Sequence, residues 1–403
     1  MVLGCFGPPR RLFRWGRGPW GSLSPMASRR IKLHYVLIYA LLGSHIPYLP
    51  VRLHELGFDE REVGWILALP GVAIMITPAL LGWAADRWVS SRQLMGILYA
   101  TAALSMAALA SATSMVAVVP TFLVFSLVSV ALFPLMDGLA LEYSGEPFSS
   151  IRVWGSVGFL APSLLLAVLL HWLPVVTALW LAAACAAVGA WAVRGLSDGP
   201  KIGPETASPW ESLGALTEPS VRAFLATVVI LALSTAIYYV WFPLLLVQLG
   251  VADAWIGLIV NVGVLVEIAC MRYAGTWEAR LGLRSLMALG CGASALRMAL
   301  LAATPSLFVA VAVQACHGLA VLSLYILPAA YVDHKVDPSV RNSAQGLLAF
   351  MRGGASRFLG AMVGAWLAPR GLGAVFSLGA VLASMATLCL LVGFRDRARV
   401  LGG

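Results

Sequence analysis

Residues 82–92 read GWAADRWVSSR, a short charged stretch between two long apolar runs. Each flanking run has about 20 residues, the length of a helix that crosses a bilayer core of roughly 30 Å. Asp86 and Arg87 would be costly inside that core, so the stretch indicates a connection between two membrane-spanning helices. The alternation of apolar runs and short polar connections continues along the whole chain.

The composition is typical of a polytopic membrane protein. Of the 403 residues, 60% are hydrophobic and 11% are charged, and the mean hydropathy is +0.89, which is far more apolar than a soluble domain. Helices are required, because unpaired backbone groups cannot face lipid and the runs lack the alternation of barrel strands. The length rule predicts an all-α membrane protein with twelve spans, at residues 33–53, 64–85, 93–111, 115–138, 153–170, 173–193, 222–246, 254–273, 284–303, 306–332, 343–368 and 372–394.

Basic residues predict the orientation. Of the 27 Lys and Arg, 20 fall on one side of the predicted membrane, whereas Arg52, Arg61 and Arg370 fall on the other. The positive-inside rule therefore places both termini in the cytoplasm, with the protein in the plasma (inner) membrane. The net charge of +9 follows from this topology and from anionic lipid, and requires no nucleic-acid partner.

The longest polar stretch inside the chain predicts two halves. It is rich in Gly, Pro and Ser, which favours a linker over a span. Residues 1–25 are either a cytoplasmic arm or sequence ahead of a true start at Met26. The expected domains are an N-terminal arm (1–32), a six-helix bundle (33–193), a cytoplasmic linker (194–221), a second six-helix bundle (222–394) and a cytoplasmic tail (395–403).

A constant offset of 193 residues relates the two halves without a gap. Matches in one register, each beside corresponding spans, favour an internal repeat over chance. The pairs are Gly57 with Gly250, Gly64 with Gly257, Gly82 with Gly275, and Arg87 with Arg280.

The stretch 82–92 resembles the loop motif between spans two and three of the major facilitator superfamily. The matching residues are Gly82, Asp86, Arg87 and Arg92. Its cognate GTWEARLGLR (275–284) keeps Gly275 and Arg280 but has Ala279 where the acid belongs, with Glu278 one position early. The resemblance implies two six-helix bundles and a charged hinge that is remade as the halves rock.

Further strings make the likeness narrower and extend it over nearly the whole chain after residue 30. Together they resemble the subfamily that contains the 3-phenylpropionate transporters, related nucleoside symporters and, more distantly, lactose permease. The strings are PYLPVRL (47–53), FPLMDGLAL (133–141), IRVWGSVGF (151–159), GVLVEI (263–268), ALRM (295–298) and QACHGL (314–319).

Span five carries the sharpest part of this likeness. Arg152, Gly155, Gly158 and Phe159 match a substrate-facing arginine, two close-packing glycines and an aromatic on which a sugar ring lies. Arg152 and Phe159 are seven residues apart, so both can face one cavity. The resemblance makes Asp137 the acid partner of Arg152. The expected substrate-binding set is Arg152, Phe159, Trp154, Asp137, His45 and Arg357.

The second half resembles a proton-coupling site. Arg297 and His317 are 20 residues apart, as are the coupling arginine and histidine in lactose permease, and Glu267 falls where its span-eight acid falls. The carboxylate that releases the proton there has no counterpart, because its position is Ala320. The titrating group must therefore be Glu267, Asp137 or His317, or a mixture of them.

Each of these residues also has a structural interpretation. Glu267 and Arg297 could form a static interhelical pair, His317 could be a packing histidine, and Asp137 could snorkel from its helix end. Arg352 and Arg357 in span eleven match no motif. Arg357, near mid-membrane, either binds an anionic substrate or pairs with an acid.

Other classes of protein lack their motifs in this sequence. There is no Walker A loop, no zincin HExxH and no G-x-S-x-G elbow, and the six cysteines are singletons, so no enzyme, cofactor, disulfide or metal site is indicated. The expected function is proton-coupled symport of a small organic solute by a monomer, with an aromatic acid such as phenylpropionate ranked first and a nucleoside or sugar next. The alternatives are a drug/proton antiporter, favoured by the partial motif GFLAP (158–162), and a non-transporting sensor with the same fold.

Overall fold

The computed structural model describes residues 25–85, 90–143, 148–196, 218–336, 341–395 and 400. Every regular element in this part of the chain is helical, which confirms the all-α prediction. The predicted linker and tail lie mostly outside the described residues. The first helix begins at Pro25, earlier than the predicted residue 33, because the polar turns before the apolar run are already helical.

The N-terminal half is built from seven α-helices and one short 3-10 turn. Its first span is broken after His45, where Pro47 and Pro50 lack the N–H groups that a continuous helix needs. The elements are α1 (Pro25–His45), α2 (Leu49–Glu55), α3 (Glu60–Ala85), α4 (Ser91–Ser111), α5 (Met115–Tyr143), α6 (Phe148–Leu169), α7 (Thr177–Ala192) and η1 (Val193–Gly195).

The C-terminal half contains two spans that are interrupted by π-helical turns. One turn precedes Pro328, which lacks a backbone N–H, and the other contains the pair Gly353 and Gly354. The elements are α9 (Pro219–Gln248), α10 (Asp253–Leu281), α11 (Leu283–Ala303), α12 (Leu307–Ala312), η2 (Val313–Cys316), α13 (His317–Val321), η3 (Leu322–Ile326), α14 (Leu327–Lys335), α15 (Arg341–Ala349), η5 (Phe350–Ala355), α16 (Ser356–Leu367), η6 (Ala368–Arg370) and α17 (Leu372–Gly393).

Each of the twelve predicted spans coincides with one helix or with a run of consecutive helices. Ten helices or helix runs within the described residues are long and apolar enough to cross a membrane. The other two predicted spans are α3 and the run α15 to α16, which pack against each other.

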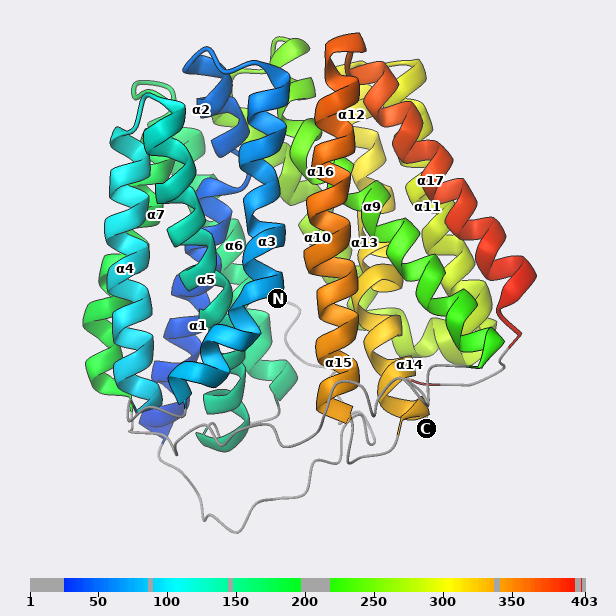
Figure 1. The fold of residues 1–403 in the computed structure, drawn as a ribbon, viewed down its shortest axis with the longest axis horizontal. Helices are drawn as coiled ribbons and strands as arrows, with labels where there is room; N and C mark the ends of the chain where they lie inside the picture. Colours follow the sequence, from blue (N-terminus) through cyan, green and yellow to red (C-terminus); the bar gives the residue numbers. More distant parts are fainter. Residues whose placement is uncertain are drawn as a thin grey trace, which may run out of the picture.

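The two halves stand side by side, with α1 to α7 in one and α9 to α17 in the other (Figure 1). They meet where α3 lies against α16 and where α6 lies against α10. At the first contact the backbones touch, because a Cβ on Gly71 would lie only 2.7 Å from the Phe358 nitrogen. At the second, Asn261 Nδ2 donates to the Leu160 carbonyl at 3.4 Å.

The predicted repeat is visible in these contacts. Gly57 and Gly250 both have positive φ, 82° and 75°, and each follows the last turn of a helix. Gly64 packs on Ala365 of the opposite half, and its cognate Gly257 packs on Ser163 of the opposite half. The same pair of glycines therefore creates both inter-half contacts.

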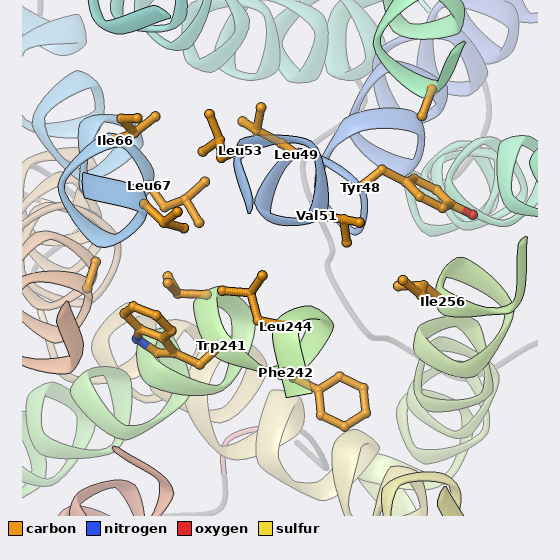
Figure 2. Packing of buried hydrophobic residues seen from close by; sticks show 14 of the residues in the cluster. Tyr48, Leu49, Val51, Leu53, Ile66, Leu67, Trp241, Phe242, Leu244 and Ile256 are labelled. Atoms are coloured by element: carbon orange, nitrogen blue, oxygen red, sulfur yellow. The ribbon is translucent and has the colours of Figure 1, made fainter. Parts of the chain in front are cut away.

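Apolar packing closes the molecule at the end that carries α2, which we term the α2 end. Figure 2 shows α2 residues Leu49, Val51 and Leu53 between α3 and the C-terminal half, opposite Trp241 and Leu244 of α9. All of these side chains are buried. Because α2 belongs to one half and α9 to the other, their contact holds the halves together at this end.

A substitution of Gly257 tests whether the halves are closed at this end. A Cβ there would overlap the Tyr48 hydroxyl and lie 2.9 Å from Ser163 Oγ, so Gly257→Val should wedge the α2 end open. Spin labels on cysteines at Trp172, in the connection after α6, and at Phe308, in the first turn of α12, should report a longer distance in the variant. The background needs the six native cysteines replaced.

Gly292→Val is the matched control, because a Cβ at Gly292 would meet nothing within 4 Å. An unchanged label distance in Gly257→Val, with the control also unchanged, would show that the α2 end tolerates the added side chain and is not sealed as described.

Candidate functional site

Asp137, Arg152 and two tyrosines form a cluster in the N-terminal half. Arg152 Nη1 lies 3.5 Å from Asp137 Oδ1, and the same oxygen accepts a hydrogen bond from the Tyr35 hydroxyl. The Arg152 guanidinium lies 6.0 Å from the centroid of the Tyr39 ring. The side chains of Arg152 and Asp137 are 50% and 33% exposed, so the pair can meet a solute.

Glycines bring α1 and α6 close enough to build this cluster. A Cβ on Gly155 would lie 2.8 Å from the Tyr39 ring, and a Cβ on Gly158 would lie 2.7 Å from the Val36 Cα. The sequence pattern R-x-x-G-x-x-G thus has a packing reason for both glycines. The tyrosines were not singled out from the sequence, although their spacing of four residues on α1 puts Tyr35 and Tyr39 on one face.

Phe159 and Trp154 relate differently to Arg152. Phe159 lies two turns along the same face of α6 and is partly buried, as the spacing predicts. Trp154 lies two residues from Arg152, about 200° around the helix, and is 42% exposed. The helix geometry does not bring Trp154 to the ion pair.

Glu267, His317 and Arg297 form a line in the C-terminal half. Arg297 Nη1 lies 3.1 Å from His317 Nδ1, and His317 Nε2 lies 3.5 Å from Glu267 Oε2. Arginine can only donate, so Nδ1 is the acceptor and the neutral ring carries its proton on Nε2, facing the carboxylate. The side chain of Glu267 is 23% exposed, whereas that of His317 is 4% exposed.

Tyr238 and Gln314 hold Arg297 at the buried end of this line. The Arg297 guanidinium lies 3.9 Å from the centroid of the Tyr238 ring, and Tyr238 donates to Gln314 Oε1 at 3.0 Å. A Cβ on Gly263 would lie 2.6 Å from that same oxygen, so the glycine lets α10 approach. Sequence reasoning missed Tyr238 and Gln314; a signal exists for Gln314, which lies one turn before His317.

The two clusters face each other across the space between the halves. Glu267 is close enough to interact electrostatically with Arg152 and with Tyr39. Arg352 interacts electrostatically with Arg152 as well. A change of charge at Glu267 therefore changes the electrostatic environment of Arg152 in the opposite half.

Arg352 links the two π-helical turns. From η5 its Nη1 donates to the carbonyls of Leu324 and Tyr325 in η3, at 3.3 and 3.1 Å, and its guanidinium lies 4.9 Å from the Tyr325 ring centroid. This contact explains an intramembrane arginine that matches no sequence motif.

His45 and Arg357 lie toward the α2 end and are linked to the second cluster through Tyr239, whose ring stands edge-on to His317 with centroids 5.9 Å apart. They line one small cavity between the halves and interact electrostatically with each other. The structure thus brings these two predicted substrate-binding residues together, but not with Arg152.

The loop motif is only partly within the described residues. Asp86 and Arg87 fall outside them. Gly82 is in the last turn of α3 and Arg92 is in the first turn of α4. In the cognate motif, Gly275 and the exposed Arg280 lie on α10, and the displaced acid Glu278 is fully buried and accepts a hydrogen bond from the Val400 backbone amide.

A family model decides the identity of this assembly of helices. The model of the MFS_1 like family matches residues 28–378. The chain belongs to this family. It is therefore an integral membrane transporter of the major facilitator superfamily that moves small solutes across a bilayer, and not an enzyme.

Relatives of this family member share most of its length. The maltose permease of Geobacillus stearothermophilus is 28% identical over 405 residues, covering 94% of this chain and 96% of that protein. The putative nucleoside transporter YegT of Escherichia coli (strain K12) is 25% identical and covers 77% of each chain.

Solved structures share the fold. A crystal structure of the nucleoside transporter NupG superposes with a TM-score of 0.79 at 21% identity, covering 93% of this chain and 100% of that one. The human organic anion transporter MFSD10 superposes with a TM-score of 0.62 at 18% identity, covering 91% and 100%. At these identities the likeness is one of fold.

The difference in burial between Arg297 and Arg152 predicts that they contribute differently to the free energy of unfolding. Arg297 is 1% exposed, so Arg297→Gln should destabilise the protein by about 3 kcal/mol, because it leaves the buried end of the Glu267 line without its cation. Arg152 is half exposed, so Arg152→Gln should cost less than about 1 kcal/mol. Thermal unfolding of both variants in one detergent tests this, and equal melting temperatures would contradict it.

Proposed function

We propose that this transporter is a proton-coupled symporter of a small organic solute and works by alternating access. The observation that carries the proposal is the line Glu267, His317 and Arg297 facing the exposed pair Arg152 and Asp137. One cluster offers a carboxylate that can take a proton, and the other offers donors and acceptors for a solute. We further propose that the chain acts as a monomer in the plasma membrane, with both termini in the cytoplasm.

Glu267 is the best candidate for the proton carrier. His317 Nδ1 accepts from Arg297, so this ring cannot take a second proton without breaking that bond. Asp137 accepts from Tyr35 and pairs with Arg152, both of which favour its charged form. Among the described residues, the carboxylate of Glu267 pairs with His317 alone, and it is partly exposed, so a proton can reach it.

Charge at the solute site favours a nucleoside or a sugar over an aromatic acid. Asp137 already neutralises Arg152, and a carboxylate solute would have to approach that acid. A solute with hydroxyl groups can donate to Asp137 while it accepts from Arg152. The relatives named as a maltose permease and a nucleoside transporter support the same order. We therefore rank the aromatic acid second.

The inter-half contacts support a state that is closed at the α2 end. If the termini are cytoplasmic, the α2 end is extracellular and this state opens inward. Protonation of Glu267 would weaken its contact with His317 and change the field at Arg152, which couples the proton to the solute site.

Proteoliposomes under an imposed pH gradient test the function. Uptake of a nucleoside, a disaccharide, phenylpropionate and a lipophilic cation should identify one neutral hydroxylated solute that accumulates with the proton gradient. Outward movement of the lipophilic cation would instead establish an antiporter.

Glu267→Gln separates coupling from binding. The amide keeps the shape but cannot be charged, so uphill accumulation should be lost while solute exchange between equal pools persists. Glu218→Gln is the control. Glu218 lies directly before α9 and its carboxylate pairs with Lys335, so this variant should accumulate solute normally. Undiminished uphill transport by Glu267→Gln would remove Glu267 as the proton carrier.

Arg152→Lys tests the solute contact. Lysine keeps the charge but loses the planar fork of donors, so solute affinity should fall about tenfold, equivalent to about 1.4 kcal/mol. The exposed Arg194 at the end of α7 provides the matched control Arg194→Lys. Affinity that is equal in the two variants would argue against a planar contact between Arg152 and the solute.

A further inference from the structure

A small cavity lies beside Arg357 at the interface of the two halves. Its walls include His45, Leu67 and Phe122 from the N-terminal half, and Tyr239 and Arg357 from the C-terminal half. Its volume is about 30 Å³, room for about two water-sized particles and too small for a whole nucleoside or sugar.

Arg357 lies beside a close backbone contact between the halves. Its neighbour Phe358 touches the backbone of Gly71, and Gly354 lies one turn before it. Arg357 is ten residues from Leu367, the end of α16, which is about 15 Å along the helix. The guanidinium therefore sits deep in the span.

The guanidinium of Arg357 has no counter-charge among the described residues. Within the part of the chain that the structure describes, no hydrogen bond or ion pair joins it to another residue, and no carboxylate lines the cavity. The other arginines near the inter-half space differ. Arg152 has Asp137, Arg297 has His317 and the Tyr238 ring, and Arg352 has two carbonyls and a ring.

His45 cannot supply the missing charge. Its Nδ1 donates to the Leu41 carbonyl at 2.8 Å, and its ring stands edge-on to Phe125 with centroids 4.9 Å apart. A neutral ring so fixed has one acceptor nitrogen and no negative charge. The cavity thus holds a cation that no described residue pairs with, in a wall that also contains Leu67 and Phe122, and an anion in the cavity would compensate its charge.

We propose that Arg357 forms an anion-binding subsite in this cavity, sized for a halide ion or for a single carboxylate group. The subsite lies in a cavity that neither Arg152 nor Asp137 lines, and its test does not depend on the proton-coupled symport proposed above. Because both halves wall the cavity, a bound anion also stabilises the state that is closed at the α2 end. When the halves separate there, the walls part and the anion is released.

Thermal unfolding of the full-length protein in detergent tests the subsite. Sodium chloride or sodium bromide should raise the melting temperature relative to sodium methanesulfonate of equal ionic strength, because the methanesulfonate ion is neither a halide nor a carboxylate and its sulfonate group is larger than either. Arg357→Gln should abolish this halide effect, and Arg357→Lys should retain part of it. Arg370→Gln, an exposed arginine at the α2 end, should keep the full effect.

Leu67→Phe provides a second variant that leaves Arg357 unchanged. The larger side chain reduces the cavity, so the halide concentration needed for half of the stabilisation should rise at least tenfold. If Arg357→Gln does not fold, this variant still gives a result.

The two sources of anion are distinguished by a parallel titration with phenylpropionate and its uncharged amide. Stabilisation by the acid alone, lost in Arg357→Gln or Leu67→Phe and with no halide effect, assigns the subsite to a solute carboxylate. No stabilisation by either anion, or equal stabilisation in wild type and in both variants, overturns the proposal. Loss of symport in the proteoliposome assay leaves this binding result unaffected.

Discussion

The need to partner every charge inside an apolar span organises this structure. An ionised side chain in a low-dielectric interior is tolerated only beside groups that compensate it. Arg152 pairs with Asp137 of α5, and Arg297 pairs with His317 of α13, so each charge links two spans that follow each other along the chain. These ionisable groups therefore fix helix packing, and in the function proposed above they also line the transport route.

Close helix approach makes these pairings possible. Gly155 and Gly158 let α1 reach α6, which carries Tyr35 to Asp137, and Gly263 lets α10 reach η2 and α13, which carries Glu267 to His317. A side chain on any of these glycines would push apart the helices whose charges must meet. The glycines therefore set the distance between the helices that carry the charged groups. The glycine pattern shared with known transporters reflects this packing requirement as well as the chemistry of the charged groups.

Sequence predicted the elements better than it predicted their contacts. Run length and polarity located the spans, and the offset of 193 residues located the glycines of both inter-half contacts, since these are properties of the chain itself. Tyr238 and the π-helical carbonyls that hold Arg352 could not be predicted, because their roles depend on which helix faces meet. The helix period likewise places Trp154 and Arg152 on different faces of α6, although the two residues are close in sequence.

The position of the closed end determines what a transport cycle must do. Apolar packing of α2 on α9 resists opening at that end, and no charge lies among the contacts drawn in Figure 2. The charged clusters lie farther from α2, where Arg152 and Asp137 are accessible. Alternating access, as proposed for this chain, would require the halves to move relative to each other at the backbone contact of Gly71 with Phe358. Phe358 directly follows Arg357, so the crossing of α3 and α16 combines a close contact between the halves with a charged side chain.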